Sequence, residues 1–240
     1  MVFDCVTRTH VGHKRKLNED AVLDCTARGI WAVADGMGGH HAGEVASAMV
    51  VAALGNSAPA ADIEGRIGKI VDVLEAVNDS LQELARASAG QRTIGATVVG
   101  LVADDRQYRC FWAGDSRAYR LRDGGIEQIT RDHSLVQDLV DAGMIEQDEA
   151  DKHPNANVVT RAIGAENLLR VDTVGGALND GDVFLLASDG LTRLVEVREM
   201  LAEVATHKLE AAADRLVALA LDRGAPDNVS LILVKVATSG

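Results

Sequence analysis

The chain has 240 residues, with 24 Lys and Arg against 36 Asp and Glu, which gives a formal net charge of −12. This charge and an aromatic content of only 3% argue against a nucleic-acid partner, because phosphate backbones are bound by clustered basic residues and bases by aromatic stacking. Hydrophobic residues make up 47%, so the composition is that of a folded globular chain and excludes intrinsic disorder.

Strands are expected over residues 2–9, 21–26 and 30–34, and the last of these ends abruptly at Asp35-Gly36. Helices are expected over 42–54 and 62–89. The second helix has the clearer signal, because apolar residues recur at steps of three and four from Ile63 to Leu84. Asp62 suits its N-cap and Gly90 its end.

From residue 94 the apolar period becomes that of strands, expected over 96–102, 108–113, 117–122 and 126–130. Residues 133–165, here named the flap, form the least regular long stretch and are expected to leave the body of the fold, with a short helix near 135–142. Further strands are expected over 169–174, 183–187 and 229–236, and helices over 196–204 and 208–222.

Strands and helices therefore come in groups and do not alternate regularly. This order predicts an α+β fold with mainly antiparallel sheets and helices packed outside them. No internal repeat or linker-like segment interrupts the sequence, so we expect one domain over residues 1–240.

The three cysteines are far apart and form no Cys-x-x-Cys pair, which is typical of a reducing compartment and excludes zinc bound by a cysteine cluster. The N-terminal segment lacks the profile of a secretory signal, and no apolar run approaches the roughly 18 residues of a membrane span. We expect a cytoplasmic protein with no membrane partner.

Acidic residues stand at the ends of several predicted strands. Two Asp-Gly pairs, at 35–36 and 189–190, terminate apolar runs, whereas those at 123–124 and 180–181 follow polar residues and are expected to be hairpin turns. A carboxylate at the end of a buried strand is unfavourable unless it is paired or binds a cation. Four further acids are placed similarly: Glu19, Asp20, Asp115 and Asp227.

If these acids converge, oxygen-only ligands indicate magnesium or manganese, and shared carboxylates suit a two-metal site. Scattered turn acids remain the alternative. Other catalytic patterns are missing from the sequence: Cys-x5-Arg, HExxH, GxSxG, a P-loop, and a dinucleotide-binding GxGxxG.

Six motifs in order resemble the metal-dependent Ser/Thr protein phosphatases of type 2C, in their compact bacterial form. The similarity extends from about residue 7 to 236. The motifs are Arg15-x-x-Asn18-Glu19-Asp20, Ala34-Asp35-Gly36-Met37-Gly38-Gly39-His40, Gly95-Ala96-Thr97, Ala113-Gly114-Asp115-Ser116-Arg117, Ala187-Ser188-Asp189-Gly190 and Asp227-Asn228.

The resemblance implies a β-sandwich of two antiparallel sheets flanked by helix pairs, in four αββα layers, with a centre of two manganese or magnesium ions at one end. The roles it implies follow the acid set: Asp35 bridges the ions, Asp189 and Asp227 bind the first, Glu19, Asp20 and the Gly36 carbonyl surround the second, and Asp115 with Asp189 holds a third, weaker ion. Arg15 is similar to the residue that grips the substrate phosphate.

The implied reaction is direct attack of a metal-bridging hydroxide on phosphoserine or phosphothreonine, without a phosphoenzyme. Animal members have His after Asp-Gly, where this chain has Met37. His40 matches the bacterial motif and is a candidate general acid, although a hydrogen-bonding role for His40, with water as the acid, is favoured. His41 stands where a small residue is more usual.

The leading hypothesis is a monomeric phosphatase that acts on phosphorylated proteins and opposes a bacterial Ser/Thr kinase. Two alternatives are a phosphoprotein-binding regulatory module that has lost its chemistry, and a phosphatase of small phosphoesters. The complete acid set favours an enzyme over the module.

Overall fold

The computed structural model describes residues 1–38, 41–87, 93–150, 153–165 and 167–238. Within them the strands form two five-stranded sheets whose neighbours all run antiparallel. The first sheet has the order β1 (Val2–His10), β10 (Val229–Ala237), β9 (Val183–Ala187), β6 (Arg117–Arg122) and β7 (Gly125–Gln128). The second has the order β2 (Asp20–Cys25), β3 (Ile30–Met37), β4 (Gly95–Ala103), β5 (Gln107–Ala113) and β8 (Asp172–Ala177).

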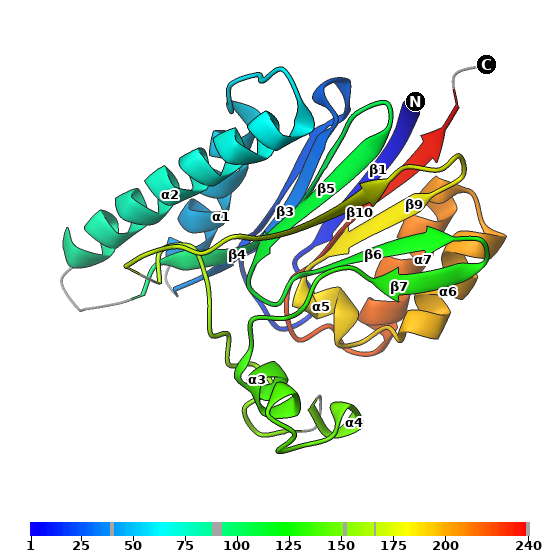
Figure 1. Cartoon of the computed structure of the whole chain (residues 1–240). Coiled ribbons are helices and arrows are strands. Elements are labelled where there is room, and N and C mark those ends of the chain that lie inside the picture. The colour runs from blue at the N-terminus through cyan, green and yellow to red at the C-terminus, as the bar shows by residue number, and fades with distance from the viewer. Residues whose placement is uncertain (39–40, 88–92, 151–152, 166, 239–240) are drawn as a thin grey trace.

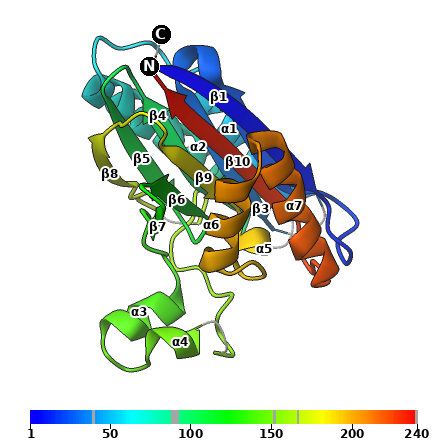
Figure 2. The same cartoon turned by 90° about the vertical axis from the view of Figure 1, so that its right-hand side faces the viewer.

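Helix pairs cover the outer faces of both sheets. Helices α1 (Ala42–Gly55) and α2 (Ile63–Ala87) pack on the second sheet, and α6 (Val197–Thr206) and α7 (Leu209–Asp222) on the first, as Figure 1 and Figure 2 show. The short helices are η1 (Thr26–Arg28), α3 (Leu135–Asp141), α4 (Gln147–Ala150) and α5 (Asp189–Thr192). The predicted α+β fold with four αββα layers is confirmed.

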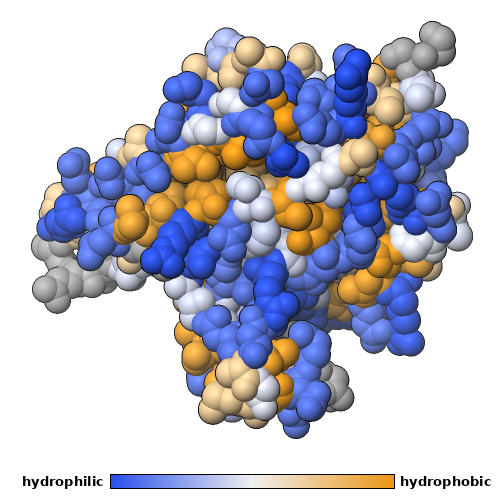
Figure 3. Space-filling view, viewed as in Figure 1, coloured by the Kyte–Doolittle hydropathy of each residue, from blue (hydrophilic) through white to orange (hydrophobic). Residues whose placement is uncertain are grey.

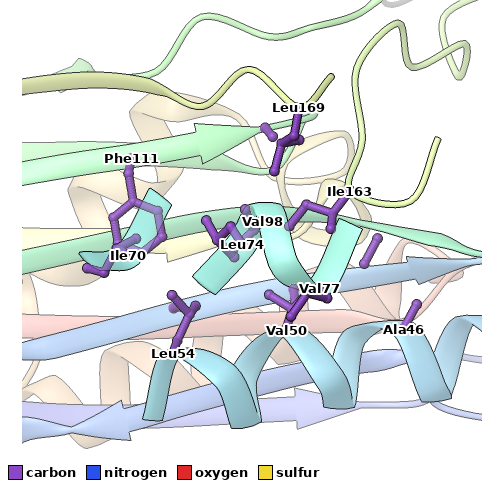
Figure 4. Packing of buried hydrophobic residues seen from close by; sticks show 14 of the residues in the cluster. Ala46, Val50, Leu54, Ile70, Leu74, Val77, Val98, Phe111, Ile163 and Leu169 are labelled. Carbon is purple, nitrogen blue, oxygen red and sulfur yellow. The ribbon is translucent and has the colours of Figure 1, made fainter. Parts of the chain in front are cut away.

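The period of two along each strand divides the apolar side chains between three cores. In β3, Ile30, Ala32 and Ala34 face the helices α1 and α2, whereas Trp31 and Val33 face the other sheet. Figure 4 shows the helix-side core, in which residues of α1 and α2 meet Val98 and Phe111 of the sheet. Buried Val, Leu, Ile and Ala side chains make up most of the three cores, which therefore need few aromatic residues.

Most predicted elements lie where expected, and β6 and β9 have the predicted bounds. Strand β3 is longer than predicted: it continues through Asp35 to Met37, because Asp35 stays in register with Thr97 of β4 and Met37 with Gly95. Strand β8 begins later than predicted, since Leu169 packs in the helix-side core and pairing with β5 starts at Asp172.

The Asp-Gly turns differ in what they connect. At Asp123-Gly124 both residues have positive φ, 51° and 76°, and the turn closes the predicted hairpin between β6 and β7. The hairpin prediction for Asp180-Gly181 was wrong, because this turn joins β8 of one sheet to β9 of the other.

Asp62 accepts a hydrogen bond from the Gly65 amide at the start of α2, as an N-cap does, whereas Gly90 lies outside the described residues.

The described part of the flap, residues 133–150 and 153–165, leaves the sandwich between β7 and β8 and carries α3 and α4 (Figure 1). Helix α3 is the predicted short helix, and Ser134 caps it by accepting from the Gln137 amide at 3.3 Å. Figure 3 shows hydrophobic residues on the surface of this projecting lobe, where Met144 is 70% exposed. The last residues of the flap return to the body of the fold, because Ile163 pairs with Ala96 of β4 and is buried in the helix-side core (Figure 4).

We expect Leu74→Ala to lower the free energy of unfolding by about 2–5 kcal/mol, because the Leu74 side chain of α2 is fully buried against the second sheet and its removal leaves a cavity. Leu84→Ala on the same helix, where the side chain is 42% exposed, is the matched control and should lose under about 1 kcal/mol. Urea denaturation measures both. Equal losses would contradict the packing described for α2.

Candidate metal centre

The antiparallel registers bring the chemically interesting strand ends to one end of the sandwich. In the second sheet, Asp20 at the start of β2 is in register with Asp35 near the end of β3, and Asp35 with Thr97 near the start of β4. In the first sheet, the end of β9 lies beside the starts of β6 and β10, because Ala187 pairs with both Arg117 and Leu231. The loops that precede β6 and β10 and the segment that follows β9 therefore lie at the same end of the first sheet.

Strand parity points two of the acids into the space between the sheets. Asp35 has the parity of Trp31 and Val33, which fill the core between the sheets, and Asp20 has the parity of Val22. The apolar filling of this space ends where the carboxylates begin. A two-residue alternation that builds the core therefore also places the acids.

A cleft of about 280 Å³ opens at this end. Five acidic side chains line it: Glu19, Asp35, Asp115, Asp189 and Asp227. Arg15, Gly36 and Asn157 of the flap also line the cleft. Asp20 does not line the cleft but is the register partner of Asp35, which does. The acids that are far apart in sequence are thus brought to one pocket.

Two polar side chains of the quoted motifs support the acids from below. Ser188 donates to Asp20 Oδ2 at 2.9 Å and accepts from the Ser230 amide at 3.0 Å, so it links both sheets. The Asn228 side chain accepts from the Glu19 amide at 2.8 Å and donates to the carbonyls of Val11 and Leu17, each at 2.9 Å. These bonds hold the start of β2 against the start of β10.

Gly36 must lack a side chain at its position. A Cβ there would lie 2.1 Å from the Gly43 carbonyl oxygen of α1 and 2.6 Å from that of Glu19. The β3 backbone consequently approaches α1 closely, and the Gly36 amide donates to the Glu19 carbonyl at 3.1 Å. This close packing holds the Asp35-Gly36 segment at the wall of the cleft.

Two arginines are paired with the acids. Arg15, on the segment after β1, places Nη2 at 2.7 Å from Asp227 Oδ2 and remains 49% exposed. Arg193, which follows α5, donates from Nε to Asp189 Oδ2 at 2.8 Å and from Nη2 to Asp115 Oδ2 at 3.0 Å. Sequence reasoning missed Arg193, whose only advance signal is its position four residues after Asp189.

Burial and mutual repulsion raise the pKa of the clustered acids. Burial, with the charge of Asp189, raises the pKa of Asp115 to about 7, although Arg193 opposes the shift. The pKa of Asp20 is raised to about 6, mainly by burial. The pKa of Asp35 lies well above its usual range because of burial and the charges of Asp20, Asp189 and other acids.

The donor set suits a hard divalent cation. Glu19 Oε1 and Asp20 Oδ1 are buried without a hydrogen-bond partner, which is unfavourable for acceptors that water cannot reach. Carboxylate oxygens are the preferred ligands of magnesium and manganese. An anionic cluster that two arginines compensate only in part, and that contains partnerless carboxylate oxygens, therefore fits such ions.

Within the described ranges, no three Asp, Glu, His or Cys side chains stand in an arrangement that would hold an ion without adjustment. Three of the acids are instead paired with arginines: Asp227 with Arg15, and Asp115 and Asp189 with Arg193. Ion binding at Asp227 requires Arg15 to change its partner.

Of the two histidines that follow Gly39, the structure describes His41 alone. His40 lies outside the described residues. His41 is 70% exposed, has a φ of 67° at the N-terminal end of α1, and approaches Glu44 through Nδ1 at 3.3 Å. Met37 lines the cleft where animal family members were expected to have His.

Comparison with known proteins identifies the family. The protein phosphatase 2C profile matches residues 9–223. The serine/threonine protein phosphatase PstP of Mycobacterium tuberculosis is 36% identical over 239 residues, which cover 98% of this chain and 45% of PstP. The chain thus spans about half the length of this relative.

Solved structures agree over nearly the whole chain. PppA, described as a key regulatory component of T6SS in Pseudomonas aeruginosa, superposes with a TM-score of 0.89 at 39% identity and 98% coverage of both chains. The catalytic domain of PstP in complex with two manganese ions gives a TM-score of 0.88 at 33% identity, with 99% of each chain covered.

The chain belongs to the protein phosphatase 2C family. Within this family it is similar to the serine/threonine protein phosphatase PstP over the whole catalytic domain of that protein. The resemblance seen in the six sequence motifs is confirmed. Among the described residues, no helix combines the length and apolar character needed to cross a lipid bilayer.

We expect the metal-free protein in EDTA to lose stability as the pH rises from about 5 to about 8. The raised pKa values of Asp20 and Asp115 mean that the native state binds more protons than the unfolded state, so stability present at low pH is lost as the pH passes about 6 to 7. A loss of roughly 1–3 kcal/mol is expected in urea denaturation.

Asp35→Asn is the matched variant for this titration, because it removes one repelling charge from the same cluster. Its free energy of unfolding should fall less steeply over the same range. A wild-type free energy that increases with pH in EDTA would contradict the repulsion described for this cleft.

Proposed function

We propose that the chain hydrolyses phosphoserine and phosphothreonine in proteins, in a reaction that depends on two divalent cations. The observation that carries this proposal is the cleft in which five acids from distant segments converge, one of them in register with Asp20, whose Oδ1 is buried without a partner. Family membership and the manganese-bound PstP domain support the same reaction.

Manganese or magnesium would be held by the acids of this cleft and one backbone carbonyl. The proposed ligands are the carboxylates of Glu19, Asp20, Asp35, Asp189 and Asp227 and the Gly36 carbonyl. When bound, the ions supply Lewis-acid activation of water and neutralise charge on the phosphoryl group.

Arg15 is proposed to bind the substrate phosphate. Its half-exposed side chain lines the cleft and pairs with Asp227. If Asp227 binds a cation, the Arg15 guanidinium is released and can bind phosphate oxygens. A guanidinium binds two phosphate oxygens at once and thereby orients the ester for attack.

In the reaction, a water oxygen forms a bond to phosphorus as the bond to the serine or threonine oxygen breaks. The leaving oxygen takes up a proton, and inorganic phosphate and the free hydroxyl are the products. We assign the supply of this proton to water and a hydrogen-bonding role to His40.

The biological setting is proposed from the same reaction. Phosphorylated proteins are the substrates, a Ser/Thr kinase supplies them, and residues 1–240 act as one monomeric catalytic domain in the cytoplasm. The flap adjoins the cleft through Asn157 and Val159, so we assign to it an influence on which phosphoproteins bind.

We expect dephosphorylation of a phosphothreonine peptide to require manganese or magnesium and to stop on addition of EDTA. Asp35→Asn should lower kcat by roughly 100-fold or more, because the proposed shared ligand loses its charge. Released phosphate measures the rate, and Arg198→Ala, at an 81% exposed side chain on α6, is the control.

Turnover that persists in EDTA would contradict the proposal. A wild-type protein that binds the peptide without releasing phosphate would instead identify a phosphoprotein-binding module. A higher kcat/KM on a sugar phosphate than on the peptide would identify a phosphatase of small phosphoesters.

We expect Arg15→Ala to raise KM for the phosphopeptide about tenfold while changing manganese affinity less, because the side chain binds substrate and not the ions. Arg15→Lys keeps the positive charge but cannot bind two phosphate oxygens in the bidentate manner of a guanidinium, so its KM should lie between those of wild type and Arg15→Ala. Steady-state kinetics and manganese titration measure the two effects. A larger change in manganese affinity than in KM would remove this role.

A further inference from the structure

Arg193 links parts of the molecule that are distant in sequence. It follows the single turn of α5, where its amide donates to the Asp189 carbonyl at 3.0 Å. Residues four apart on a helical turn share a face, which places the Arg193 guanidinium beside the Asp189 carboxylate. The side chain is only 27% exposed.

One part of the Arg193 guanidinium neutralises two acids of the cleft. Nε bonds to Asp189 at 2.8 Å and Nη2 to Asp115 at 3.0 Å. Asp115 has a 5% exposed side chain, and Arg193 is the basic residue that lowers its pKa against burial. The ion pairs are therefore shielded from solvent, where charge-assisted bonds are strong.

The other part of the guanidinium reaches the flap. Nη1 bonds to Asn157 Oδ1, and Nη2 also bonds to the Ala156 carbonyl at 3.0 Å. The base of the flap is attached separately through the backbone, where the Thr160 amide donates to the His133 carbonyl at 2.8 Å. Arg193 thus ties residues 156 and 157 directly to the acid cluster.

A guanidinium and a divalent ion cannot share the position between Asp115 and Asp189. The guanidinium nitrogens already stand at 2.8 and 3.0 Å from these carboxylates, whereas a magnesium ion must approach oxygen to about 2.1 Å. Arginine keeps its charge at any ordinary pH, so it does not withdraw by losing a proton. The third, weaker ion implied by the sequence resemblance therefore does not fit the residues present.

We propose that Arg193 is a positioning residue that takes the place of a third metal ion between Asp115 and Asp189 and fastens the flap to the cleft with the same guanidinium. The exclusion of the third ion rests on the proposed two-ion centre, whereas the fastening of the flap does not. In this chain, the charge of the acid pair and the position of the flap are coupled through one side chain.

The flap half of the proposal is tested on metal-free protein by hydrogen–deuterium exchange of the amides in residues 154–160. Arg193→Ala should raise exchange there by about tenfold, because both attachments are lost. Asn157→Ala removes only the side-chain attachment on the flap and should raise exchange by less. Arg198→Ala is the matched control and should leave exchange in this segment unchanged.

The metal half is tested by counting bound manganese, using electron paramagnetic resonance of the free ion. Wild type, Asn157→Ala and Arg198→Ala should bind two ions per chain, and Arg193→Ala should bind a third. Arg193→Lys keeps the charge but cannot reach both acids and the flap, so it should bind two ions and still exchange faster. This variant serves if Arg193→Ala does not fold.

Unchanged flap exchange in both Arg193 variants would overturn the fastening of the flap. A wild-type count of three ions, or an Arg193→Ala count no greater than that of wild type, would overturn the exclusion of the third ion. Faster flap exchange in the Arg193 variants, together with a wild type that binds two manganese ions but releases no phosphate, would uphold the role of Arg193 and refute the proposed function.

Discussion

Mutual repulsion between buried carboxylates is the constraint on which the site depends. Asp20 and Asp35 share the space between the sheets, and burial and neighbouring acids raise the pKa of both. Such a cluster opposes folding unless positive charge compensates it. Arg15 and Arg193 supply part of this charge, and divalent cations would supply the rest.

The packed sheets around the clustered carboxylates hold these side chains in place. Side chains such as Trp31 and Phe184 fill the space between the sheets and leave its acidic end fixed by strand register. Ser188 and Asn228 then join the sheets by hydrogen bonds just below the carboxylates. The acids are held by backbone geometry, so they cannot relax far apart in the absence of ions.

The sequence allowed the fold class, most strands and the acid set to be predicted, since these depend on local period and on Asp at the ends of apolar runs. It did not reveal Arg193, because its partners Asp115 and Asn157 come from other segments and meet it only through tertiary packing. The start of β8 and the turn at 180–181 were mispredicted for a related reason: strand pairing, and not local pattern, decides which sheet a strand joins.

The most direct test is anomalous diffraction from crystals soaked in manganese. The account expects two peaks in the cleft, each within roughly 2.5 Å of carboxylate oxygens and sharing Asp35, with Arg15 released from Asp227. Soaked crystals whose cleft shows no manganese, while Asp35, Asp189 and Asp227 keep their present partners, would contradict the claim that these acids are gathered to hold cations.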